Sequence, residues 1–147
     1  MKKVYVLLII LFPIFINSSF AQQAIHLQDA KIIEEIAPKE FQDYKGSLLV
    51  MPAFRRRGIK KWLTKQFDKN YGKPFHVADA TEIITGYGDD KYPIDTYKYM
   101  VFIQSSKNFS GNTIYKFQLV DRSTNTIYYD TSPSDMLLRK YIRKILK

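Results

Sequence analysis

Three short runs in the second half of the chain decide the fold: YKYMVFIQ at residues 97–104, IYKFQLVD at residues 114–121 and TIYYD at residues 126–130. Each run is rich in aromatic and β-branched residues, which favour strands. Ser, Asn, Gly and Thr separate the runs, and these residues favour turns. Apolar and polar side chains alternate along the first two runs, so each of these strands has one apolar face and one mixed face. The pattern predicts an antiparallel three-stranded meander.

A β-α-β unit is predicted upstream of the meander. The run SLLVMPAF at residues 47–54 shows no alternation, as expected of a strand that is buried on both faces. Residues 59–71 follow a helical period, with apolar side chains on one face and lysines on the other. Gly72 and Pro74 favour the end of this helix, and residues 75–78 are typical of a further short strand.

A second amphipathic helix is predicted at the C-terminus. Residues 132–135 read SPSD, which places Ser at the cap and Pro at the first position of a helix over residues 133–146. Its predicted buried stripe comprises Leu138, Tyr141, Ile142 and Ile145. Because two helices are available to cover the sheet, we expect the row of Tyr97, Tyr99 and Tyr115 to be core and not a ligand platform. The fold class is therefore predicted as α+β, a mixed sheet of about five strands with helices mainly on one face.

Residues 1–21 have the features of a secretory signal peptide. A basic start, MKK, precedes an apolar run at residues 4–16, and the small residues Ser19 and Ala21 predict cleavage after Ala21. The apolar run is shorter than the ~20 residues that a membrane-spanning helix needs. We therefore expect a cleaved signal and not a membrane anchor.

The rest of the chain is predicted to divide into two parts. We expect residues 22–46 to form an N-terminal arm with a short amphipathic helix at residues 27–36, which Pro38 ends. Residues 47–147 are expected to form a single α+β domain. Within that domain, one helical turn is predicted at residues 79–85.

The chain is basic and contains no cysteine. It carries 23 Lys and Arg against 14 Asp and Glu, a formal net charge of +9 at pH 7. The lack of cysteine excludes disulfides, thiolate metal ligands, a cysteine nucleophile and a cysteine-linked lipid anchor. We expect an exported protein, periplasmic or extracellular, that is not lipid-anchored and has no transmembrane segment after signal cleavage. The positive charge favours an anionic partner, and nucleic acid is the less favoured choice.

Residues suited to acid–base or metal chemistry are sparse, and no catalytic motif is found. The two histidines, His26 and His76, would suit a secreted nuclease with one as base and the other as acid. His26 lies in the predicted arm, however, and His76 lies in a predicted strand among apolar neighbours. No third ligand follows at a spacing that would suit a metal. We predict no catalytic residue, metal or cofactor; the alternative is a small secreted hydrolase or nuclease that uses His76 with nearby basic residues.

Clusters of basic residues are the most informative candidates for a binding site. Three adjacent arginines follow the strand at residues 47–54, lysines continue along the next helix, and the C-terminal helix has a second cluster. Such clusters are either anion-facing surfaces or the solvated faces of a basic protein, and solubility explains the arginine triplet less easily. The face of the meander that lacks tyrosines is a candidate platform. The candidate binding residues are Arg55, Arg56, Arg57, Lys60, Lys61, Lys98, Phe102 and Lys116.

Two stretches resemble a group of envelope proteins. LLVMPAF at residues 48–54, followed by an amphipathic helix, is similar to the opening strand of periplasmic envelope-assembly domains of the CsgG, LpoB and TolB-amino-terminal type. YKFQLVDRSTNTIYY at residues 115–129, followed by a helix, resembles their last hairpin. The chain departs from the group in lacking the lipid-anchor cysteine and a glycine in the hairpin turn. The resemblance implies a non-enzymatic protein, and we expect an exported, non-catalytic bacterial envelope protein that binds another envelope protein or an anionic surface.

Overall fold

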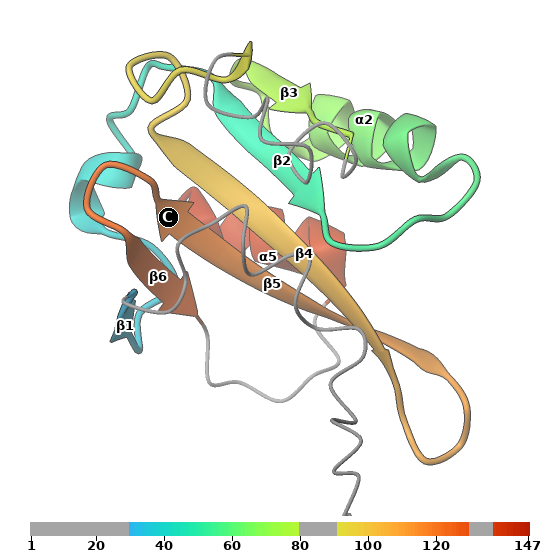
Figure 1. Cartoon of the computed structure of the whole chain (residues 1–147). Coiled ribbons are helices and arrows are strands. Elements are labelled where there is room, and N and C mark those ends of the chain that lie inside the picture. Colours follow the sequence, from blue (N-terminus) through green and yellow to red (C-terminus); the bar gives the residue numbers. More distant parts are fainter. Residues whose placement is uncertain (1–29, 80–90, 130–136) are drawn as a thin grey trace, which may run out of the picture.

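The computed structural model describes residues 30–79, 91–129 and 137–147 (Figure 1). The strands are β1 (Lys31–Ile33), β2 (Leu48–Pro52), β3 (Phe75–Val77), β4 (Tyr99–Lys107), β5 (Thr113–Asp121) and β6 (Thr126–Tyr129). They form one mixed sheet in the order β1-β6-β5-β4-β2-β3. The helices are α2 (Ile59–Asn70), α5 (Leu138–Ile145) and the 3-10 turn η2 (Lys39–Phe41). The predicted α+β class is confirmed, with one strand more than the five expected.

The predicted β-α-β unit is confirmed as β2-α2-β3. All residues of β2 are buried, which explains why its sequence shows no alternation. β2 pairs in parallel with β3 on one side and with β4 on the other. α2 is followed by Gly72, whose φ of 69° is the left-handed conformation that commonly follows a helix.

The meander is also confirmed, and its first hairpin is longer than predicted. β4 and β5 pair antiparallel from Tyr99 opposite Asp121 to Lys107 opposite Thr113. The outer part of this hairpin extends beyond the body of the sheet (Figure 1). At its tip, the Asn112 backbone N–H donates a hydrogen bond of 2.8 Å to the Asn108 side chain, which closes the turn.

The N-terminal helix predicted over residues 27–36 is wrong in its described part. Lys31–Ile33 is strand β1, which pairs in parallel with β6 and sets Ile32 opposite Ile127. This pairing satisfies backbone groups along an edge of β6 that would otherwise lack partners. The isoleucine spacing does not mark a buried helix face, because Ile32 is 64% exposed whereas Ile33 packs against the core.

The C-terminal helix is shorter than predicted. α5 begins at Leu138, because the backbone of Leu137 is extended, with φ −65° and ψ 142°. The predicted buried stripe of Leu138, Tyr141, Ile142 and Ile145 is confirmed. Several other predictions fall outside the described residues: the signal peptide at residues 1–21, His26, most of the helical turn at residues 79–85, and the Ser132 cap.

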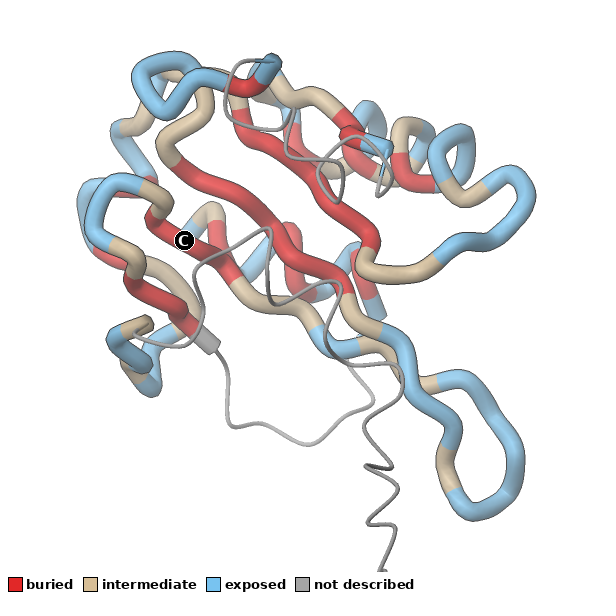
Figure 2. Tube along the Cα trace, viewed as in Figure 1, coloured by how far each residue is buried: buried red, intermediate tan, exposed pale blue. Residues whose placement is uncertain are grey.

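The two faces of the sheet carry separate apolar clusters. Figure 2 shows β2 and the first part of β4 as buried and the outer part of β4 as exposed. In the helix-side cluster, Leu63 and Phe67 of α2 join Tyr99 and Val101 of β4, which confirms that Tyr99 is core. The far-side cluster comprises Leu49, Met51, Ala78, Tyr92, Met100, Phe102, Val120 and Ile127. Tyr97 packs against the far-side cluster and not beside Tyr99, which corrects the predicted tyrosine row.

Candidate functional site

The arginine triplet lies in the loop between β2 and α2, at the carboxyl end of β2. β3 runs parallel to β2, so Asp79 after β3 reaches the same end of the sheet. An open hollow of about 410 Å³ lies there, lined by the three arginines together with Phe54, Lys60 and Asp79 among others. Proteins with parallel strands commonly bind ligands outside the carboxyl ends of those strands, so the loop has the position of a binding site.

The start of α2 adds positive potential to this loop. Gly58 precedes the helix with φ 78°, no side chain caps it, and its first turn contains no acidic residue. Lys60 and Lys61 occupy that turn instead. The helix dipole makes this end positive, so an anion there is favourable by ~0.3–1 kcal/mol and a cation is unfavourable by a similar amount. The two lysines therefore lie where they stabilise the isolated fold least.

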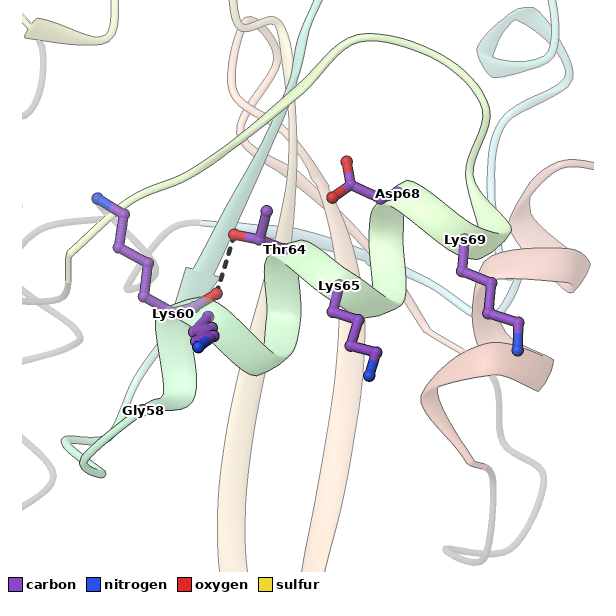
Figure 3. A pocket seen from close by; sticks show the side chains of 7 residues that line it. Gly58, Lys60, Thr64, Lys65, Asp68 and Lys69 are labelled. Carbon is purple, nitrogen blue, oxygen red and sulfur yellow. Dashed lines mark hydrogen bonds between the residues drawn. The ribbon is translucent and has the colours of Figure 1, made fainter.

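The cations of the loop and of α2 are not engaged in ion pairs within the described part of the chain. This holds for Arg55, Arg56, Arg57, Lys60, Lys61, Lys65 and Lys69. Figure 3 shows Lys60, Lys65 and Lys69 as separate side chains along α2, with Asp68 pointing away from Lys65 and Lys69. The Thr64 hydroxyl donates to the Lys60 carbonyl at 2.9 Å, which is a contact internal to the helix. The positive charge of this surface is thus left for solvent or for a ligand.

An aromatic cluster anchors one arginine of the triplet. Arg56 Nη1 donates to the Tyr115 hydroxyl at 3.0 Å. The Tyr115 ring lies 5.7 Å from that of Phe54 and 6.4 Å, stacked, from that of Trp62. The pattern of residues 59–71 places Trp62 with the apolar side chains of its helix, yet Trp62 is 41% exposed because it lies on the flank of α2 beside Leu63. Sequence reasoning missed this cluster, since nothing in the sequence signals contact between Arg56 and Tyr115.

The two α-helices of the described residues concentrate the charge of the molecule. α2 and α5 pack against each other on one face of the sheet, and we call their outward surface the helix layer (Figure 1). α2 has four lysines and one aspartate, and α5 has two arginines and two lysines without a carboxylate, which gives seven net positive charges. The whole chain has a net charge of +9, so the remainder is nearly neutral. The exposed cations of the layer are Lys60, Lys61, Lys65, Lys69, Arg139, Lys140, Arg143 and Lys144.

The candidate platform on the meander is not formed. Phe102 is 1% exposed and packs in the far-side cluster, so its assignment to an exposed platform is wrong. The physical reason is that residues 99–103 of β4 lie between two strands and are buried on both faces. Lys116 is exposed, but it shares its face of β5 with Val120 of the far-side cluster, because side chains two and four residues apart lie on one face. Lys116 is therefore separated from the helix layer by the sheet.

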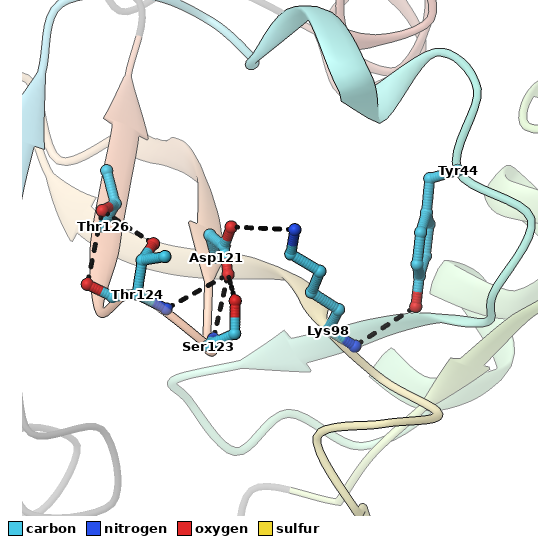
Figure 4. Close-up of polar contacts among 6 residues, drawn as sticks. All are labelled: Tyr44, Lys98, Asp121, Ser123, Thr124 and Thr126. Atoms are coloured by element: carbon cyan, nitrogen blue, oxygen red, sulfur yellow. Dashed lines mark hydrogen bonds and ion pairs between the residues drawn. The ribbon is translucent and has the colours of Figure 1, made fainter.

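Lys98 belongs to a polar network at the end of β5 (Figure 4). Its Nζ lies 3.5 Å from Oδ2 of Asp121, a residue that is only 2% exposed. Oδ1 of Asp121 accepts hydrogen bonds from the Ser123 N–H at 2.9 Å, the Ser123 hydroxyl at 2.6 Å and the Thr124 N–H at 3.3 Å. In the same turn, Asn125 takes a left-handed conformation with φ 51°, where glycine is usual. Lys98 thus compensates a buried carboxylate that itself shapes the turn, and its assignment as a binding residue is not supported.

The ring of His76 lies away from the basic surface. His76 pairs with Leu49 of the far-side cluster, and its ring packs on Tyr92 and Tyr97 at 5.3 Å and 6.3 Å. The Tyr92 hydroxyl lies 3.2 Å from His76 Nε2, within hydrogen-bond distance. A hollow of about 410 Å³ along the β3 edge is lined by His76 together with Lys60, Asp68 and Lys73, among other residues. The imidazole ring itself packs on Tyr92 and Tyr97, on the side of the sheet opposite α2.

Metal binding and membrane spanning find no support in the described chain. Within residues 30–79, 91–129 and 137–147, no three His, Cys, Asp or Glu side chains come together as metal ligands. No helix in those ranges is long and apolar enough to cross a bilayer. Comparisons of the chain with protein-family models, curated proteins and solved structures find no match. The resemblance to envelope-assembly domains therefore stays a prediction, and function is argued from charge, packing and geometry.

Proposed function

We propose that this protein is an exported, non-catalytic bacterial envelope protein that binds an anionic surface through the arginine triplet and the helix layer. The observation that carries the proposal is the run of seven arginine and lysine side chains from Arg55 to Lys69, none with an ion-pair partner among the described residues. Export, to the periplasm or the cell exterior, rests on the signal-peptide features of residues 1–21.

An anionic partner would relieve two electrostatic costs. Cations gathered on one surface repel one another, and this repulsion falls when anions approach. Lys60 and Lys61 also oppose the positive end of α2, where backbone N–H groups favour an anion. Arg56 uses Nη1 for Tyr115, and a guanidinium has further donors in a planar fork that suits carboxylate or phosphate oxygens. The surface is therefore built for negative charge.

The direct test is retention of the purified protein on immobilised dextran sulfate and on bacterial envelope extract. We expect retention at low salt and release at about 1 M salt, where the Debye length falls to about 3 Å. The double variant Arg55→Gln/Arg57→Gln is expected to elute earlier, because two cations are lost at the hollow. The matched control is Lys107→Gln/Lys116→Gln, which removes two exposed cations from the β4–β5 hairpin and is expected to elute close to the unaltered protein.

The outcomes separate the partners. Retention on envelope extract that survives about 1 M salt would indicate a packed interface with another envelope protein instead of an anionic surface. Equal behaviour of the two double variants would contradict a role for the arginine triplet. Absence of retention on both materials at low salt would refute the proposal.

One observation favours the alternative of a hydrolase or nuclease that uses His76 with nearby basic residues: the hollow that His76 lines together with Lys60, Asp68 and Lys73. The His76 ring, however, packs on Tyr92 and Tyr97, on the face opposite α2. The arginine triplet lies beyond the carboxyl end of β2, whereas His76 pairs with Leu49 near the start of that strand. The arginine triplet and the imidazole are therefore not arranged around one reacting group.

A further inference from the structure

We propose that the anionic surface bound by the helix layer is a lipid bilayer that contains anionic headgroups, with Trp62 at the boundary between lipid and water. This inference rests on the proposed function and names its partner. The proposed contact surface is formed jointly by α2 and α5, whose basic residues appear in the sequence as two separate clusters.

The shape of the layer suits an extended partner. Both helices turn their buried residues to the same face of the sheet, so their outward faces lie in one layer. α2 alone, with 12 residues, extends over about 18 Å at 1.5 Å per residue. Lys61 and Lys65 lie opposite the buried residues Leu63 and Phe67, at the outermost line of the helix. Cations spread over such a length match an array of headgroups better than one small anion, which requires donors that converge.

Trp62 is the second observation, and it points to lipid among the anionic surfaces. Its side chain is 41% exposed, its ring stacks on Tyr115 at 6.4 Å, and Lys65 lies one turn further along the same side of α2. Indole rings combine a large apolar area with one N–H donor, and they gather at the headgroup level of membranes. A soluble polyanion offers charges but no apolar region for the ring. Lysines around a half-exposed tryptophan are typical of protein surfaces that lie on anionic membranes.

The chain supplies its own reporter for the test, because Trp62 is its single tryptophan. The purified protein is mixed with vesicles of equal parts phosphatidylglycerol and phosphatidylcholine, with vesicles of phosphatidylcholine alone, and with soluble dextran sulfate. Binding is measured by co-sedimentation, and the environment of Trp62 by its emission maximum and by acrylamide quenching. We expect binding to the anionic vesicles with a blue shift and less quenching, and no binding to phosphatidylcholine vesicles.

Paired variants locate the contact. Lys61→Gln/Lys65→Gln is expected to weaken binding to the anionic vesicles roughly thirtyfold, since each cation near an anionic bilayer contributes about fivefold to affinity. Both positions are exposed, so the fold is expected to persist, and Trp62 remains as the reporter. The control Lys107→Gln/Lys116→Gln removes the same charge from the hairpin and is expected to leave binding nearly unchanged.

The results distinguish this inference from the proposed function. Binding to dextran sulfate without binding to anionic vesicles would overturn the lipid inference and leave the proposed function intact. Failure to bind either the vesicles or dextran sulfate would overturn the inference, and lack of retention on envelope extract as well would refute the proposed function. Equal binding to both kinds of vesicle, vesicle binding without a change in Trp62 emission, or equal losses in the two double variants would each overturn the inference.

Discussion

The two faces of the sheet have different surroundings. The helix-covered face contributes both to stability and to the proposed binding surface, whereas the far face contributes to stability alone. On one face, α2 and α5 cover the helix-side cluster and present a basic outward surface. On the other face, the far-side cluster is equally buried, and no helix among the described residues covers it. A helix needs only one stripe for the core and keeps the rest for solvent or ligands. A strand has two faces, and β2 and residues 99–103 of β4 use both for burial, so these segments have no surface left for recognition.

The largest expected effect tests whether the far face is core. Phe102→Ala should lower the free energy of unfolding by about 3–5 kcal/mol, because a fully buried aromatic ring is replaced by a cavity. Urea denaturation followed by circular dichroism measures the change. Lys116→Ala, an exposed position on the same face, is the control and should stay within about 0.5 kcal/mol. If Phe102→Ala behaved like this control, the far face would be an open platform and the comparison would fail.

A smaller loss of stability is expected at alkaline pH, and it comes from tyrosines of the helix-side cluster. Burial raises the pKa of Tyr71, Tyr99 and Tyr128, which belong to the helix-side cluster. Unfolded tyrosines ionise near pH 10, before the folded ones, so this contribution to stability is present below about pH 10 and is lost as the pH rises. Urea midpoints measured from neutral to alkaline pH should therefore fall above that value.

Two phenylalanine variants assign this alkaline sensitivity to a face. The Tyr71 hydroxyl is buried and has no hydrogen-bond partner among the described residues, so Tyr71→Phe should retain stability at neutral pH and lose less of it at high pH. Tyr97→Phe, on the far face, serves as the control. If Tyr71→Phe lost stability with pH as steeply as the unaltered protein, the burial of Tyr71 would not contribute to the alkaline loss.

The sequence predicts the elements of the fold well where periodicity is set by local packing. The unbroken apolar run of β2, the amphipathic pattern of α2 and the alternation along β5 each follow from the faces that those elements bury. β1 is not predictable in this way, because a strand of three residues is too short to show a period. Its extended conformation depends on pairing with the edge of β6. Tyr97 is misplaced because it lies just before β4, where alternation no longer fixes the direction of a side chain.

The candidate site is predictable in part. The arginine triplet and its lysines are visible as charges in the sequence, whereas the packing of α5 against α2 depends on the order of strands between them. The contact of Arg56 with Tyr115 joins residues from two distant elements and leaves no local signal. Lys98 and Phe102 are predicted as binding residues from strand alternation alone. Alternation cannot show that a buried aspartate pairs with Lys98, or that a second apolar cluster surrounds Phe102.

The central claim is that cations of the helix layer are retained for binding at the expense of stability, and one charge reversal tests it most directly. Lys61→Glu places an anion at the positive end of α2 and should raise the free energy of unfolding by about 0.3–1 kcal/mol. The same change should reduce retention on dextran sulfate. Lys116→Glu makes an equal change of charge on the opposite face and should leave both quantities nearly unchanged. Equal retention of the two variants, or a loss of stability in Lys61→Glu, would contradict the claim.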